Sequence, residues 1–119
     1  MKLNYFLIPG VSEVRLPQTE RQFMDSIEQA VCIEFGLTVK EIHQDWNKSE
    51  LVLARNVFYY LCRKYSHIVL KTVSGRYNKN HATAIYGVKM ITKRIEASPN
   101  FAIRMRNLEG RINKFHCIR

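Results

Sequence analysis

The 119-residue sequence lacks the features by which several classes of protein are recognised. No stretch approaches the roughly 18–20 consecutive apolar residues that a membrane span requires, and the apolar residues 5–8 are followed at once by Pro9-Gly10. The three cysteines are odd in number and have no CxxC spacing, which argues against a disulfide framework. We therefore expect a reduced, cytoplasmic protein without membrane contact, in which Cys32 and Cys62 pack as small hydrophobic residues.

Motifs for catalysis and for nucleotide or metal binding are missing as well. The four histidines, including His116 beside Cys117, are dispersed along the chain, and no H-E-x-x-H or G-x-S-x-G pattern occurs. There is also no glycine-rich phosphate loop followed by Lys and Ser or Thr. The sequence predicts no enzyme, no metal, no cofactor and no bound nucleotide.

Acidic residues are scarce in the C-terminal part of the chain. Residues 1–47 carry a net charge of −3, whereas residues 48–119 carry +12, which together give the overall +9. A one-sided balance of this kind favours a polyanionic partner such as nucleic acid.

The apolar spacing predicts an all-α bundle after an N-terminal arm. Residues 1–18 have no helical period and form an extended arm, in which residues 5–8 form a short strand or dock on a partner, and we find no β-hairpin signal. Residues 19–119 form one domain. The first expected helix has Thr19 as its N-cap and ends at Gly36. The next four span residues 39–43, 49–65, 69–76 and 81–97, and the last begins at Pro99. Val39, Val52, Val69 and Tyr65 are predicted to face the core.

The most informative stretch is residues 69–86, which combines a short helix, a polar turn at residues 77–79 and a second helix beginning at His81. This is the helix-turn-helix pattern, whose second helix can enter the DNA major groove. At 100° per residue, Ala84 and Ile91 fall on the buried face of that helix, and Thr83 and Tyr86 fall opposite.

The outward face of this second helix is small at its first turn and surrounded by cations. Asn80 can bond an adenine bidentately, and the Thr83 methyl can touch a thymine methyl. The residues predicted to read bases are Asn80, His81, Ala82, Thr83 and Tyr86. The residues predicted to contact phosphate or the DNA backbone are Lys48, Arg55, Lys71, Arg76, Lys79, Lys89 and Lys93. The alternative is a solvated helix in a packed bundle, with Asn80 serving only as a cap.

These segments resemble a known family. In residues 27–31 (IEQAV), 35–37 (FGL), 51–55 (LVLAR) and 80–87 (NHATAIYG), the chain is similar to the C-terminal DNA-binding domain of the bacterial replication initiator DnaA, a Trp-repressor-like helical fold. The resemblance extends from residue 27 to about residue 112. It implies that the signature helix reads the major groove and that Arg55 holds the backbone near the site.

The sequence also departs from the family. Asn80 stands where the family has aspartate, Ala82 where it has the first threonine, and Lys79 where it usually has arginine. The basic loop that enters the minor groove in the family is reduced to residues 45–48 (DWNK), in which Trp46 is expected to be a core or lid residue. We therefore expect a DNA target different from the usual initiator box.

The expected function is sequence-specific binding of double-stranded DNA by a stand-alone DnaA-like domain without an ATPase, associated with the nucleoid and either regulatory or linked to replication. The alternative is a protein-interaction adaptor, or a competitor that has lost specific DNA reading, with Tyr59, Tyr60, the arm and the last helix as its contact surface. The arm leaves open a homodimer or a protein partner. RNA binding is disfavoured because no clustered aromatic platform is evident.

Overall fold

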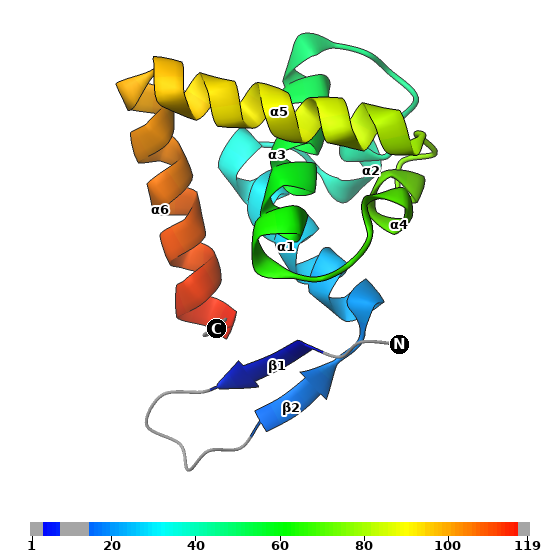
Figure 1. Cartoon of the computed structure of the whole chain (residues 1–119), viewed down its shortest axis with the longest axis vertical. Coiled ribbons are helices and arrows are strands. Elements are labelled where there is room, and N and C mark those ends of the chain that lie inside the picture. The colour runs from blue at the N-terminus through cyan, green and yellow to red at the C-terminus, as the bar shows by residue number, and fades with distance from the viewer. Residues whose placement is uncertain (1–3, 8–14, 117–119) are drawn as a thin grey trace.

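The computed structural model describes residues 4–7 and 15–116, with side chains over residues 19–112. Within this described part of the chain, six helices make up the bundle, so the predicted all-α class is confirmed (Figure 1). Their bounds agree with the predicted ones to within about two residues. The helices are α1 Glu20–Phe35, α2 Val39–Ile42, α3 Ser49–Tyr65, α4 Leu70–Gly75, α5 His81–Ala97 and α6 Pro99–His116.

The N-terminal arm contains two short strands. Strand β1 (Asn4–Leu7) pairs antiparallel with β2 (Arg15–Gln18), so the expectation of no hairpin was wrong. The hairpin was not recognised from the sequence for two reasons. Residues 8–14 separate the strands by more than the two to five residues of a typical hairpin loop, and Pro17 lies inside the second strand. The hairpin lies at the foot of the molecule, away from α5 (Figure 1).

The first two helices begin as the sequence predicts. The Thr19 hydroxyl accepts from Gln22 N at 3.1 Å while Gln22 Oε1 accepts from Thr19 N at 3.1 Å, and Thr38 forms the same reciprocal box with Glu41. Each box satisfies two N–H groups that the helix start would otherwise leave unpaired. Gly36 ends α1 with φ 66°, a left-handed conformation that a side chain would strain.

Helix α3 occupies the centre of the bundle, with α1 on one side and α5 crossing it on another (Figure 1). Its fully buried side chains include Val57, Phe58, Leu61 and Cys62. The buried stripe is therefore rotated towards Phe58 and Cys62 relative to the prediction, and Val52 is 37% exposed. Because two helices cover α3, its apolar face is wide and its spacing alone does not fix its centre.

Two further valines are exposed, contrary to expectation. Val39 is 48% exposed at the start of α2, and Val69 is 64% exposed because it is the N-cap of α4 rather than a residue inside it. Tyr65 is half-buried. Within residues 19–116, no helix is both long enough and apolar enough to cross a bilayer.

Candidate nucleic-acid interface

The candidate interface is built on the first turn of α5, which Asn80 caps. Asn80 has extended backbone angles (φ −87°, ψ 169°), and its Oδ1 accepts from Thr83 N at 2.9 Å and from Thr83 Oγ1 at 3.0 Å. A short side-chain oxygen here satisfies an N–H group that the helix leaves unpaired, which is why Asn is a preferred cap. The cap fixes where α5 begins.

The turn before α5 is anchored on its inner side. Tyr77 is only 6% exposed, and its ring packs 5.3 Å from that of Phe58 on α3. Asn78 adopts φ 58°, a left-handed conformation that Asn tolerates better than most residues. Lys79 N then donates to Ser74 O at 3.0 Å and closes the turn on α4. The predicted turn at residues 77–79 is therefore correctly placed between the two helices.

The two faces of α5 are divided as the spacing predicts. Ala84, Gly87 and Ile91 are buried, whereas His81, Ala82, Thr83 and Tyr86 are exposed, Tyr86 by 62%. The outward face therefore begins with small side chains and continues with an aromatic one. Small side chains at the first turn are what close approach of a helix to base edges requires.

Gly87 lets α5 lie close against α3. A Cβ added at Gly87 would stand 2.4 Å from Asn56 Oδ1 and 2.9 Å from Tyr59 Cδ2, both shorter than real contacts. The glycine is needed here for close approach rather than for an unusual backbone angle. It fixes the depth at which α5 sits on the bundle.

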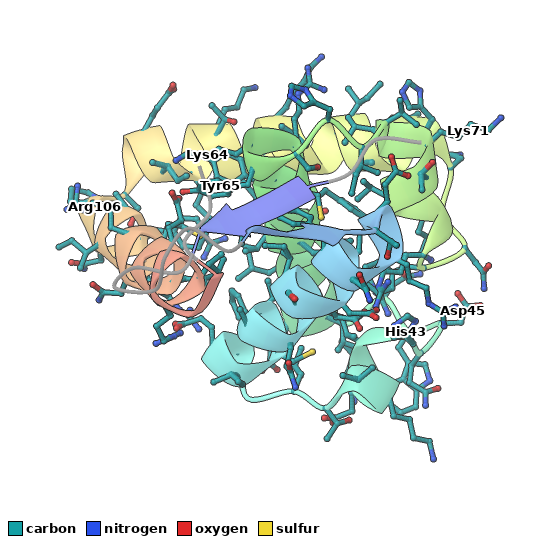
Figure 2. All side chains as sticks on the ribbon, turned by 90° about the horizontal axis from the view of Figure 1, so that it is seen from below. His43, Asp45, Lys64, Tyr65, Lys71 and Arg106 are labelled. Carbon is teal, nitrogen blue, oxygen red and sulfur yellow. The ribbon has the colours of Figure 1, made fainter. Side chains whose placement is uncertain are left out.

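Five of the predicted phosphate-contacting cations, all lysines, are exposed or partly exposed. Lys71, Lys89 and Lys93 are exposed, and Figure 2 shows Lys71 on the side of the molecule where α5 lies. Lys48 is exposed with its Nζ 5.1 Å from the centroid of the Trp46 ring. The Nζ of Lys79 is 3.5 Å from Asp45 Oδ1, but that carboxylate is almost fully exposed, and such surface pairs are weak.

Arg76 is engaged inside the molecule, contrary to the phosphate role predicted for it. Its Nε donates to Glu28 Oε2 at 3.0 Å, and its Nη2 donates to Glu28 Oε1 at 2.9 Å and also to Asp25. The Arg76 side chain is only 14% exposed. This bidentate pairing connects the turn before α5 to α1, so Arg76 stabilises the position of the turn rather than contacting a partner.

Glu28 is the centre of this cluster. Its carboxylate accepts from Tyr77 Oη at 2.7 Å and lies 2.7 Å from His43 Nε2, in addition to the Arg76 bonds. Burial acts to raise the pKa of Glu28, but the hydrogen bonds from Arg76 and Tyr77 and the nearby positive charge outweigh it, so the pKa lies below its ordinary value. The same surroundings, burial first, raise the pKa of Tyr77.

Arg55 is likewise buried, at 3% exposure, and holds a loop. Its Nε donates to Ile42 O at 3.0 Å, its Nη1 to Trp46 O at 2.8 Å and its Nη2 to Gln44 O. The guanidinium is thus occupied by three carbonyls, one at the end of α2 and two in the loop between α2 and α3, so the predicted phosphate contact was wrong. The contact to the DNA backbone that the family resemblance implies for Arg55 is therefore not available in this arrangement, and Arg55 instead holds the protein's own main chain.

That loop carries Trp46 to the surface. The indole is 50% exposed and borders a hollow of about 240 Å³ that Leu37 and Leu51 also line, so it is not a core residue. It belongs to the rim of the hollow, beside Lys48.

Glu28 is the supporting residue that the sequence analysis missed. It stands between Met24 and Cys32 at intervals of four, and both of these are buried. A carboxylate in the middle of a buried stripe was a readable signal for an internal partner, because buried charges are paired. Nothing in the sequence indicated that Arg76, 48 residues later, is that partner. Burial raises the pKa of Cys32 to about 11, in keeping with its predicted role as a packed hydrophobic residue; Cys117 lies outside the described residues.

Residues 24–91 match the family of the bacterial dnaA protein helix-turn-helix. This stretch covers more than half of the chain and contains α2, α3, α4 and the first two-thirds of α5. The chain belongs to this family. The predicted resemblance is thereby confirmed, and the DnaA helix-turn-helix is the unit that carries the exposed face of α5.

Several curated relatives are chromosomal replication initiator proteins DnaA. The chain is 30% identical over 70 residues to that of Oleidesulfovibrio alaskensis, covering 59% of this chain and 15% of the relative. It is 28% identical over 99 residues to that of Bacteroides thetaiotaomicron (82% and 21%) and 28% identical over 95 residues to that of Chlorobaculum tepidum (79% and 19%). The chain thus spans about a fifth or less of the length of these relatives.

Proposed function

We propose that this chain binds double-stranded DNA sequence-specifically, with α5 as the helix that enters the major groove. The observation that carries the proposal is a capped, exposed first turn of α5 together with the exposed lysines Lys71, Lys89 and Lys93. Membership of the DnaA helix-turn-helix family supports it, since the relatives are named as chromosomal replication initiators.

The proposed contacts fall into two groups. Base edges are read by the side chains at the start of α5 and one turn further on: Asn80, His81, Ala82, Thr83 and Tyr86. Phosphates are contacted by the surface lysines: Lys48, Lys71, Lys79, Lys89 and Lys93. Arg55 and Arg76 act as positioning residues that hold the loop and the turn on which these side chains stand.

We further propose that the domain has a role that is regulatory or linked to replication and is associated with the nucleoid, with residues 1–18 as a separate arm. A second copy or another protein could pair with the two-stranded sheet of that arm.

The adaptor hypothesis is less well supported than DNA binding. It required Tyr59 at the contact surface, but Tyr59 is 1% exposed and lies beneath α5. An adaptor would also not require the exposed lysines Lys89 and Lys93 on the helix that carries the exposed first turn.

Duplex binding measured against salt concentration tests the proposal. Neutralising several phosphates releases counterions, so log K should fall steeply with log salt, whereas an adaptor would show little affinity and no slope. Thr83→Glu should abolish binding by placing a carboxylate against the DNA. The fold should persist, because Thr83 is exposed at the third helical position, where Glu is favourable.

Thr92→Glu is the matched control. Thr92 is also an exposed threonine of α5, but it lies nine residues away, on the opposite side of the helix axis. This variant should retain most of the affinity. Retained binding by Thr83→Glu, or equal loss in both variants, would contradict the placement of α5 in the groove.

A further inference from the structure

The Asn80 cap determines which of its two amide groups can reach a base. Both donors of Thr83, its backbone N–H and its hydroxyl, point to Asn80 Oδ1, at 2.9 and 3.0 Å. An N–H group can be accepted only by the oxygen of an amide, so the orientation of the side chain follows from the bond itself. The oxygen of Asn80 has two lone pairs, and Thr83 uses both.

The amide NH₂ of Asn80 is then the group left for DNA. Asn80 is exposed, and no hydrogen bond among the described residues uses its Nδ2. The capped side chain therefore presents two donors and no acceptor. The bidentate contact to adenine that the sequence analysis predicted needs a donor and an acceptor together, so it would require Asn80 to leave the cap.

We infer that Asn80, held in its cap, selects a base with a keto oxygen in the major groove, guanine or thymine, over one with an amino group. Guanine O6 and thymine O4 accept hydrogen bonds, whereas cytosine N4 and adenine N6 donate them from the corresponding place. When the NH₂ of Asn80 faces the amino group of a base, neither donor has an acceptor. The free-energy cost of these unpaired donors disfavours adenine and cytosine. This inference rests on the proposed function and specifies the target at one base pair.

The inference can be tested by reversing the polarity of this one group. Asn80→Asp keeps the shape and the cap but replaces the free NH₂ by an acceptor oxygen. Asn80→Ser keeps the cap and offers no second polar group. Each variant, with the wild-type chain, would be used to select bound sequences from a randomised duplex pool, after circular dichroism has verified its helix content.

The wild-type chain should enrich guanine or thymine on one strand at one position by about fivefold or more over the amino bases. Asn80→Asp should enrich cytosine or adenine on that strand at the same position. Asn80→Ser should lose the preference there and keep it elsewhere. Preferences are compared within each variant, so a uniform loss of affinity from the added negative charge does not affect the result.

The possible failures are distinguishable. If the wild-type chain selects no sequence and binds no duplex, the proposed function itself fails. If it selects a site but Asn80→Asp selects the same base at every position, the function stands and the keto preference is refuted. Selection of adenine together with loss of binding to 7-deazaadenine at that position would also refute it, because that would show donation to adenine N7 rather than to a keto oxygen.

Discussion

Lys89 and Lys93 on α5 and Arg55 and Arg76 beneath it carry the same charge but have different environments. The lysines are exposed on the outer side of the helix, whereas the arginines are buried or nearly so and bond to carbonyls or carboxylates of the chain. The difference follows from chemistry, because a planar guanidinium satisfies several acceptors at once and a flexible ammonium stays hydrated. Charge counted from a sequence therefore overstates the charge available to a partner.

The strongest test of this comparison is Glu28→Ala. The substitution leaves the guanidinium of Arg76 and the hydroxyl of Tyr77 without their buried partner, and removing one member of a buried pair costs about 3–5 kcal/mol of unfolding free energy. Equilibrium unfolding in urea measures it. Lys93→Ala, on the outer side, should change the same quantity by less than about 0.5 kcal/mol. Similar losses of unfolding free energy in the two variants would show that the inner cations are no more important for stability than the outer lysines.

Gly87→Ala tests the packing of α5 against α3. The new Cβ must displace Asn56 Oδ1 and the Tyr59 ring, and overpacking costs about 1–3 kcal/mol, offset by the roughly 1 kcal/mol that alanine gains over glycine in a helix. Thermal and urea unfolding measure the net loss. The double variant with Asn56→Ala should recover part of it, because the shorter of the two contacts is then absent. No recovery would assign the loss to Tyr59 alone.

Acid should weaken the inner cluster around Glu28. The pKa of Glu28 is lower in the folded protein than its ordinary value of 4.5, so its stabilisation is complete above about pH 4.5. It is lost as the pH falls from there through the folded pKa. Unfolding free energy measured between pH 3 and pH 6 should therefore decline below 4.5. Glu28→Gln should make that decline in unfolding free energy shallower. Some decline should remain because of Glu34: burial acts to raise its pKa, but Arg104 and Arg111 outweigh this and lower it.

The smallest expected effect is that of a single outer lysine on DNA binding. Lys93→Ala should weaken all duplex sequences about equally and reduce the salt slope by roughly one. Arg106→Ala is the control, because Arg106 is an exposed cation of α6 that is not among the proposed phosphate contacts. A loss confined to one sequence would instead indicate base reading by Lys93, and an equal change in the control would indicate a general charge effect.

Local signals in the sequence were enough for much of the helical framework. The caps Thr19, Thr38 and Asn80 and the terminator Gly36 could be read because each acts on residues within four positions of itself. The exposed face of α5 could also be predicted, since a helix with one partner surface has one clear apolar stripe. The stripe of α3 was misjudged at Val52 because that helix is covered from two sides.

The sequence by itself determined the helix order, the exposed first turn of α5 and the excess of positive charge, since these depend on spacing and composition. Only the tertiary structure decided which cations face outward, because Glu28 meets Arg76 across 48 residues and Arg55 meets a loop nine to thirteen residues before it. It also decided which amide group of Asn80 is free. Pairing over such separations depends on how helices pack, and no periodicity along the chain records it.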